Sequence, residues 1–148
     1  MPNGLRNVAQ FAVAALLGVT LASCDMPHDP EMTTSLVRET HTIHLGWIEG
    51  AERDEHVTDV LSRLRRKTDA NVEVTRGDSE NLLPDLATGK LDLVYGTLPK
   101  DSPWSKEVYF GRALGWRASP PSHEPVSRFV MRNGENEWIM LVENAARP

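Results

Sequence analysis

The chain has 148 residues, of which 40% are hydrophobic and 25% charged, and its formal net charge is −5 at pH 7. This composition excludes an intrinsically disordered chain, and the length is enough for one domain. The mildly acidic balance argues against binding to a phosphate backbone, so we expect no nucleic-acid partner.

The first part of the chain has the pattern of a secretory signal. Arg6 is the only charged residue ahead of a largely apolar run from Val8 to Val19. A run of about 12 residues is too short to cross roughly 30 Å of hydrocarbon as a helix. A positive start, a short apolar run and then small residues are typical of an export signal that is removed from the mature protein.

The apolar run leads to the segment Leu21-Ala22-Ser23-Cys24, which resembles the lipobox of bacterial lipoproteins. The resemblance implies that residues 1–23 are a cleaved signal peptide and that an acylated Cys24 anchors the protein in a lipid bilayer. Cys24 is the only cysteine, and acylation accounts for a lone thiol in an exported protein. Asp25 resembles the enterobacterial signal for staying at the inner membrane. The expected location is therefore the periplasmic side of the cell envelope; an ordinary signal peptide with a chance cysteine is the alternative.

Residues 24–40 are predicted to form a flexible tether. The stretch from Asp25 to Glu39 is polar, contains Pro27 and Pro30, and has no apolar period. Such a segment would lift a domain formed by residues 41–148 off the bilayer.

A pattern of alternating strands and helices begins at Thr42. Apolar residues three and four positions apart mark an amphipathic helix, and short runs rich in β-branched residues mark strands. The predicted elements in chain order are a strand at 42–47, a helix with the stripe Val57, Val60, Leu61 and Leu64, a strand at 71–75, a helix capped by Asp78 or Ser79, and a strand at 91–96. This order predicts an α/β fold with a small, mostly parallel sheet and flanking helices.

The last third of the chain predicts two more elements. The stretch from Ala118 to Pro125 contains three prolines and breaks regular structure. A strand is predicted at 127–131, and a helix follows Gly134 with Trp138 on its apolar face.

The run from Leu82 to Gly96, LLPDLATGKLDLVYG, resembles the family 3 extracellular solute-binding proteins, the periplasmic receptors of amino-acid-type ABC importers. The segments Ala70 to Val74 and Lys106 to Phe110 extend this resemblance. It implies the type II periplasmic-binding-protein fold, in which two lobes close on a ligand. The segment Arg128 to Trp138 resembles the family's return to lobe one, but only a proline-rich linker precedes it. The family carries on the order of a hundred residues there, so we expect a single lobe without the second one.

The resemblance also implies a ligand site, because open parallel sheets bind ligands beyond the carboxyl ends of their strands. Trp47, Glu49, Thr97 and Lys100 are predicted to lie at that edge. Trp47 is either a stacking surface or a core residue, and the other positions are either ligand contacts or ordinary strand-end and turn residues. Trp104 stands where the amino-acid receptors have the arginine that grips the ligand carboxylate, so recognition of an α-carboxylate by the family's usual residue is in doubt.

The sequence gives no sign of an enzyme or of a bound cofactor. No G-x-S-x-G, G-x-G-x-x-G or P-loop motif occurs. Histidines and carboxylates gather in one region without the spacing of a zinc motif, so no metal site is predicted; they are His41, His44, Glu49, Glu52 and His56.

The leading interpretation is a membrane-anchored module of the envelope that binds a small polar, amino-acid-like solute for or with an ABC-type transporter. The alternative is an accessory protein that has kept the fold, binds no ligand and contacts a transporter permease or another membrane protein. That alternative predicts an exposed apolar face that includes Trp47, Trp104 and Trp116. A third possibility is that two copies pair face to face and each replaces the other's missing lobe.

Overall fold

The computed structural model describes residues 28–115 and 121–148. The predicted signal peptide, the anchor residue Cys24 and Trp116 lie outside the described residues. What the sequence predicts for these residues therefore stays a prediction.

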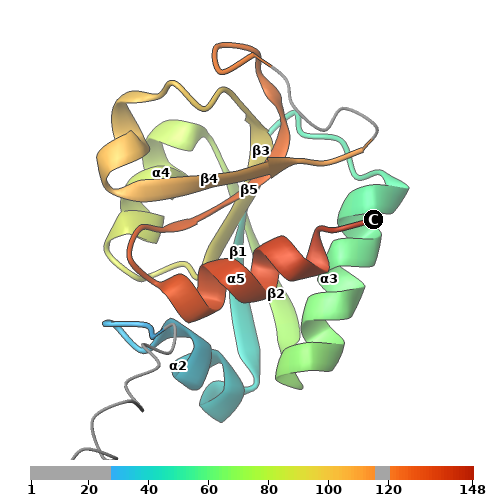
Figure 1. The fold of residues 1–148 in the computed structure, drawn as a ribbon, viewed down its shortest axis with the longest axis vertical. Coiled ribbons are helices and arrows are strands. Elements are labelled where there is room, and N and C mark those ends of the chain that lie inside the picture. Colours follow the sequence, from blue (N-terminus) through green and yellow to red (C-terminus); the bar gives the residue numbers. More distant parts are fainter. Residues whose placement is uncertain (1–27, 116–120) are drawn as a thin grey trace, which may run out of the picture.

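Five strands form one sheet in the order β2-β1-β3-β5-β4 (Figure 1). The strands are β1 (Thr42–Ile48), β2 (Asn71–Gly77), β3 (Leu93–Leu98), β4 (Val108–Ala113) and β5 (Val126–Arg132). β1 pairs in parallel with β2 and β3, and β5 pairs antiparallel with β3 and β4. The predicted α/β fold with a mostly parallel sheet is confirmed, and β5 is the one strand that runs against the others.

Helices cover both faces of the sheet. They are α2 (Thr33–Thr40), α3 (Glu55–Thr68), α4 (Ser79–Ala87) and α5 (Asn136–Ala145), with a short 3₁₀ helix η1 (Pro103–Lys106). α2, α3 and α5 pack on one face, and α4 packs on the other. Asp54 and Asp78 begin α3 and α4 by accepting hydrogen bonds from the backbone N–H groups of Val57 and Asn81, as their short polar side chains favour.

Two hydrophobic clusters make up the core, one on each side of the sheet. The predicted stripe of α3 is buried in the first cluster. Residues 93–96 of the central strand β3 are all buried, because helices lie over both of its faces. Strand β3 begins two residues later than predicted.

The prediction of a flexible tether through residue 40 is wrong for residues 33–40, which form helix α2. Thr33, Thr34 and Val37 are buried against the rest of the domain. Only one of these is a large apolar residue, so the sequence shows no apolar period here. The folded domain therefore begins before residue 41.

Two carboxylates hold α2 in place: one lies before α5 and binds the start of α2, and the other lies before α2 and binds the start of α5. Glu135, which is only 1% exposed, accepts hydrogen bonds from the backbone N–H groups of Glu31 at 2.8 Å and Thr33 at 3.0 Å. In return, Asp29 accepts one at 3.0 Å from the backbone N–H of Trp138, in the first turn of α5. Both carboxylates face the positive end of a helix dipole. The chain is thus fixed to the domain from Asp29 onward.

No helix within the described residues is both long enough and apolar enough to span a bilayer.

Candidate functional site

The parallel strands β1, β2 and β3 end at the same edge of the sheet, the upper edge in Figure 1. We call this the carboxyl edge; it consists of the loops 49–54, 99–102 and 121–125 and the strand ends beneath them. The loops are tied to one another by backbone hydrogen bonds, from Glu49 N–H to Gly77 O at 2.9 Å and from Lys100 N–H to Ser122 O at 2.8 Å. In a sheet of this type, the carboxyl edge is where a ligand site is expected.

Three aromatic rings from adjacent strands form a buried row below this edge. The ring centroids of Trp47 and Tyr95 are 4.6 Å apart, and those of Tyr95 and Phe129 are 5.2 Å apart. Trp47 Nε1 donates to Ala51 O at 3.1 Å, and the Tyr95 hydroxyl donates to Glu52 O at 2.9 Å. The row therefore fixes the loop 49–54 from below.

Trp47 is 1% exposed, so the structure assigns it to the core rather than to an open stacking surface. The prediction that Trp47 belongs to an exposed, partner-facing apolar surface is wrong for the same reason. Trp104, on η1, is half-buried and packs against the core on the α4 side. It offers no cation in place of the arginine found at the matching position of the family.

Glu49, Thr97 and Lys100 are exposed at the carboxyl edge, where the sequence analysis placed them. All three leave their side chains available to a ligand, since none takes part in a side-chain hydrogen bond or salt bridge in the part of the chain that the structure describes. They bring one carboxylate, one hydroxyl and one ammonium group to this edge.

Two arginines that the sequence analysis did not single out complete the edge. The guanidinium carbon of Arg53 lies 5.1 Å from the centroid of the Trp47 ring, and that of Arg76 lies 5.8 Å from it. Arg53 comes from the loop after β1, and Arg76 is the next-to-last residue of β2. Both guanidiniums are therefore in cation–π contact with the same indole. A cation at the carboxyl end of a parallel strand was the available signal for Arg76; no motif marks Arg53.

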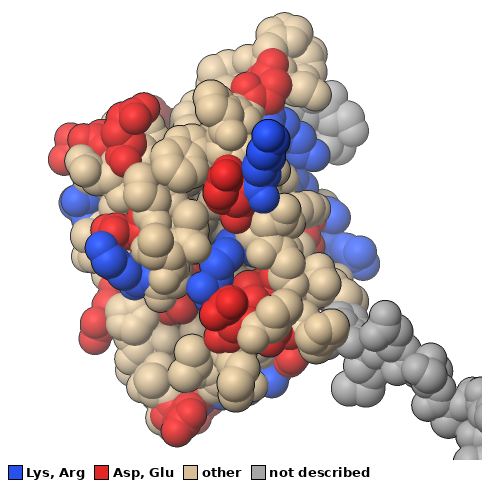
Figure 2. All heavy atoms as spheres, turned by 90° about the vertical axis from the view of Figure 1, so that its left-hand side faces the viewer, with Lys and Arg blue, Asp and Glu red and all other residues tan. Residues whose placement is uncertain are grey.

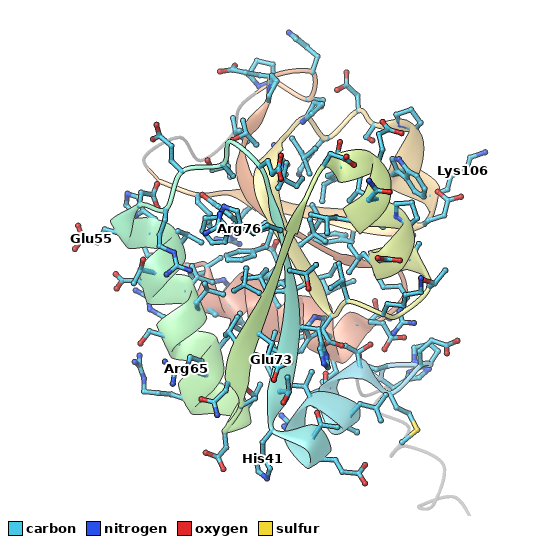
Figure 3. All side chains as sticks on the ribbon, turned by 180° about the vertical axis from the view of Figure 1, so that it is seen from behind. His41, Glu55, Arg65, Glu73, Arg76 and Lys106 are labelled. Atoms are coloured by element: carbon cyan, nitrogen blue, oxygen red, sulfur yellow. The ribbon has the colours of Figure 1, made fainter. Side chains whose placement is uncertain are left out.

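Neither guanidinium is neutralised within residues 28–115 and 121–148, where the salt bridges involve other side chains. Figure 3 shows Arg76 on the upper half of β2, well above Glu73 on the same strand and Arg65 on α3. Arg53 also borders a cleft of about 500 Å³ between α3 and the edge strand β2, together with Leu61 and Val74. Two unpaired guanidiniums, 5.1 and 5.8 Å from the centroid of the same indole ring, offer charged donors that a carboxylate can accept from.

A third arginine lies inside the fold. Arg128 on β5 is 1% exposed; one of its Nη atoms donates to Gly111 O at 3.0 Å, while Nε and the other Nη have no partner. Burial lowers the pKa of this guanidinium, and the charge of Glu143 opposes the change. It faces Gly96 across the β3–β5 ladder, where any Cβ would meet Ile48 at 2.6 Å. An incompletely paired buried cation is costly and adds positive potential below the edge.

A separate cavity of about 560 Å³ lies between α3, the end of β4 and the end of α5. His56, Asp59, Arg63 and Arg112 contribute to its walls. Arg63 donates to Ala145 O at 3.0 Å, and Arg112 pairs with Glu143, so both guanidiniums are already engaged in holding α5. This cavity is less suited to an anion than the pair at the carboxyl edge.

The charged side chains on the face shown in Figure 2 are mixed, with basic and acidic groups among each other and no broad field of one sign. That face therefore has no electrostatic field of one sign that would attract a highly charged partner over a long distance.

No family model and no curated protein matches the sequence. Solved structures do match. The arginine-bound form of domain 1 from TmArgBP, the ArgBP of T. maritima, has a TM-score of 0.61 and 14% identity, over 76% of this chain and 96% of that one. The chain folds as a single lobe of a periplasmic binding protein.

Two further structures agree with that fold. An ancestral cationic amino acid solute-binding protein, AncCDT-1, has a TM-score of 0.60 and 14% identity, over 77% of this chain and 92% of that one. The substrate-binding protein of an amino acid ABC transporter has a TM-score of 0.53 and 10% identity, over 71% and 91% of the two chains. All three are binding proteins by name, and at these identities the likeness establishes the fold.

Proposed function

We propose that this lobe binds a small, amino-acid-like solute at its carboxyl edge, in the bacterial envelope, for or with an ABC-type transporter. One observation carries the proposal: Arg53 and Arg76 both contact the Trp47 ring and have no carboxylate partner, at the edge where open parallel sheets bind ligands.

The two guanidiniums would hold the ligand carboxylate in place of the arginine that the sequence lacks at Trp104. Planar guanidinium and carboxylate groups match in bidentate geometry. Exposed Glu49, at the end of β1, would face the ligand's ammonium group. The arrangement therefore favours a zwitterion over a simple anion.

A lone lobe is compatible with ligand binding. The neighbour that is a single domain of TmArgBP is named as an arginine-bound form, and the present chain spans almost its full length. Closure between two lobes is therefore no prerequisite for the proposed binding. A one-sided site buries less of the ligand, so we expect weaker affinity than a two-lobed clamp would give.

The envelope location rests on Cys24 and the residues around it. An acylated Cys24 would confine the lobe near the membrane, and confinement raises its effective concentration at a transporter. Confinement of this kind compensates for a weak, one-sided contact. A Cys24→Ser variant should be released from membranes, and the lipid-anchor proposal fails if that variant stays bound.

Calorimetric titration of the mature chain with the protein amino acids tests the ligand. We expect at least one zwitterionic amino acid to bind, and Arg76→Gln to weaken it roughly 10- to 150-fold through loss of a charged hydrogen bond. The control is Arg65→Gln, on the lower part of α3, which should leave affinity unchanged. The proposal is refuted if no amino acid binds, or if both variants behave alike.

A second candidate function is an accessory protein that has kept the fold, binds no solute and contacts a permease or another membrane protein. Trp104 at the family's arginine position favours it. Crosslinking in native membranes distinguishes the two: recovery of a protein partner together with silent titrations supports the accessory role.

A further inference from the structure

We propose that the surface of α2 and the last turn of α3, opposite the carboxyl edge, rests on the phospholipid bilayer, so that the ligand edge faces away from the membrane. This inference uses the anchoring of Cys24 from the proposed function. We call the surface the basal face and define it by Met32, which precedes α2, by Leu36 on α2 and by Arg65, Arg66 and Lys67 on α3.

The length of chain before the folded domain carries the first step. The backbone at His28 already accepts a hydrogen bond from Asn136 N–H at 3.3 Å, and Asp29 is fixed by its carboxylate. Three residues lie between Cys24 and His28, and the four residue steps from one to the other span at most about 14 Å in a fully extended chain. A folded domain of this size has a diameter of roughly 35 Å. The anchor therefore holds the His28 side of the lobe toward the bilayer.

The orientation of the strands carries the second step. α2 and the lower end of α3 lie at the bottom of Figure 1, and the carboxyl edge lies at the top. Figure 3 shows the same separation, with His41 and Arg65 low on the molecule and Glu55 and Arg76 in its upper half. His41 Nδ1 contacts Asp69 O at 2.8 Å, which brings the end of α2 against the end of α3 in a single surface.

The exposed side of α2 carries the third step. Met32 and Leu36 are 59% and 48% exposed, whereas Thr33, Thr34 and Val37 on the opposite side are buried. Met32 is the N-terminal cap residue of α2 and Leu36 lies in the helix itself. The start of the folded domain therefore exposes two large apolar side chains, where they can enter the bilayer interface.

The basic side chains carry the last step. Arg65, Arg66 and Lys67 form the final turn of α3 and are all exposed. Long basic side chains near a membrane surface pair with anionic headgroups. Glu39 and Asp69 lie on the same surface, so its net charge is small. Contact of Met32 and Leu36 with lipid should therefore contribute more to the free energy of membrane binding than the charged groups do.

A fluorescence experiment on the acylated, mature chain in phospholipid vesicles tests this orientation. With Cys24 acylated, Leu36→Cys provides the only free thiol, which is labelled with a polarity-sensitive dye; Ser122→Cys, in the loop at the carboxyl edge, is the distant control. Met140→Cys on α5 is the matched control, because Met140 is 49% exposed and Leu36 is 48% exposed. We expect lipid-borne quenchers to quench the Leu36 dye several-fold more than either control, and added anionic lipid to strengthen that difference.

A second measurement needs no label. Hydrogen exchange of residues 31–40 should slow when the acylated chain is on vesicles, and the Met32→Gln/Leu36→Gln variant should lose this slowing. Equal quenching at all three dye positions, with no slowing of exchange, overturns the inference. Shielding of Leu36 in native membranes but not in pure lipid vesicles also overturns it, since the occupant is then a protein. A mass measurement that finds Cys24 unacylated instead refutes the anchor, which is a separate failure.

Discussion

The buried carboxylate of Glu135 offers a sharp test of how the N-terminal helix is held. It is 1% exposed and accepts backbone hydrogen bonds from Glu31 at 2.8 Å and Thr33 at 3.0 Å, more than a hundred positions away in sequence. We consider the substitution Glu135→Ala, which removes both acceptors and leaves two N–H groups at the first turn of α2 without a partner.

The expected loss follows from these contacts. A hydrogen bond to a charged group contributes about 1.5–3 kcal/mol, so two of them give roughly 3–6 kcal/mol. The remaining attachment of α2 consists of the buried side chains of Thr33, Thr34 and Val37. It also includes the hydrogen bonds of the Asp29 carboxylate with the Trp138 N–H and of Arg132 with the Thr33 hydroxyl. We therefore expect α2 to detach locally while the sheet stays folded. A loss of about 3 kcal/mol raises the open population roughly 150-fold.

Native-state hydrogen exchange, read separately for residues 29–40 and for β3, measures this population. Glu137→Ala is the matched control, two positions along the same helix. Glu137 pairs with Arg38 at 3.0 Å on the surface, and such a pair contributes about 0–1 kcal/mol. Equal acceleration of exchange in the two variants would refute the reasoning, as would Glu135→Ala accelerating β3 as much as α2.

Three further predictions concern the core. Burial is the main reason that the pKa of Tyr95 is raised, so the stabilising contribution of its neutral hydroxyl is present below the ordinary value of 10.0 and is lost as pH rises through the higher folded value. In Tyr95→Phe, the unfolding free energy measured with denaturant should therefore fall less steeply with pH at alkaline pH than in the unsubstituted protein. An unchanged slope would count against this. Gly96→Ala should cost about 1–3 kcal/mol of unfolding free energy because its Cβ would meet Ile48 at 2.6 Å, whereas Gly77→Ala, with its nearest contact at 3.5 Å, should be nearly neutral; similar values for both would show that the ladder relaxes. Arg128→Met should raise the unfolding free energy by about 1 kcal/mol because it removes two buried nitrogen atoms that have no hydrogen-bond partner. A lower midpoint of unfolding in guanidinium chloride would contradict that.

Much of the fold was predictable because it depends on local pattern. The apolar stripe of α3 and the continuous apolar run of β3 are visible in the sequence itself, because each involves residues that are close together along the chain. Helix α2 was missed for the opposite reason. Two backbone N–H groups at its N-terminal end donate to Glu135, which is distant in sequence, and its packing uses threonines rather than a row of large apolar residues.

The candidate site divides in the same way. The positions of Glu49, Thr97 and Lys100 were predictable, because each lies at or just beyond the carboxyl end of a strand whose direction the α/β order fixes. The meeting of Arg53 and Arg76 was not, because it depends on the place of the Trp47 ring between β2 and the loop after β1. Spacing along the chain carries no information about which two cations share an indole.

The junction between β4 and β5 has a consequence for how this lobe relates to two-lobed receptors. Leu114 N–H donates to Ser127 O at 2.8 Å, so the chain leaves and re-enters the sheet at neighbouring points. We therefore expect a domain inserted between Gly115 and Pro121 to leave the pairing of β4 with β5 intact. The same opening would admit a reporter domain next to the carboxyl edge and convert the lobe into a sensor.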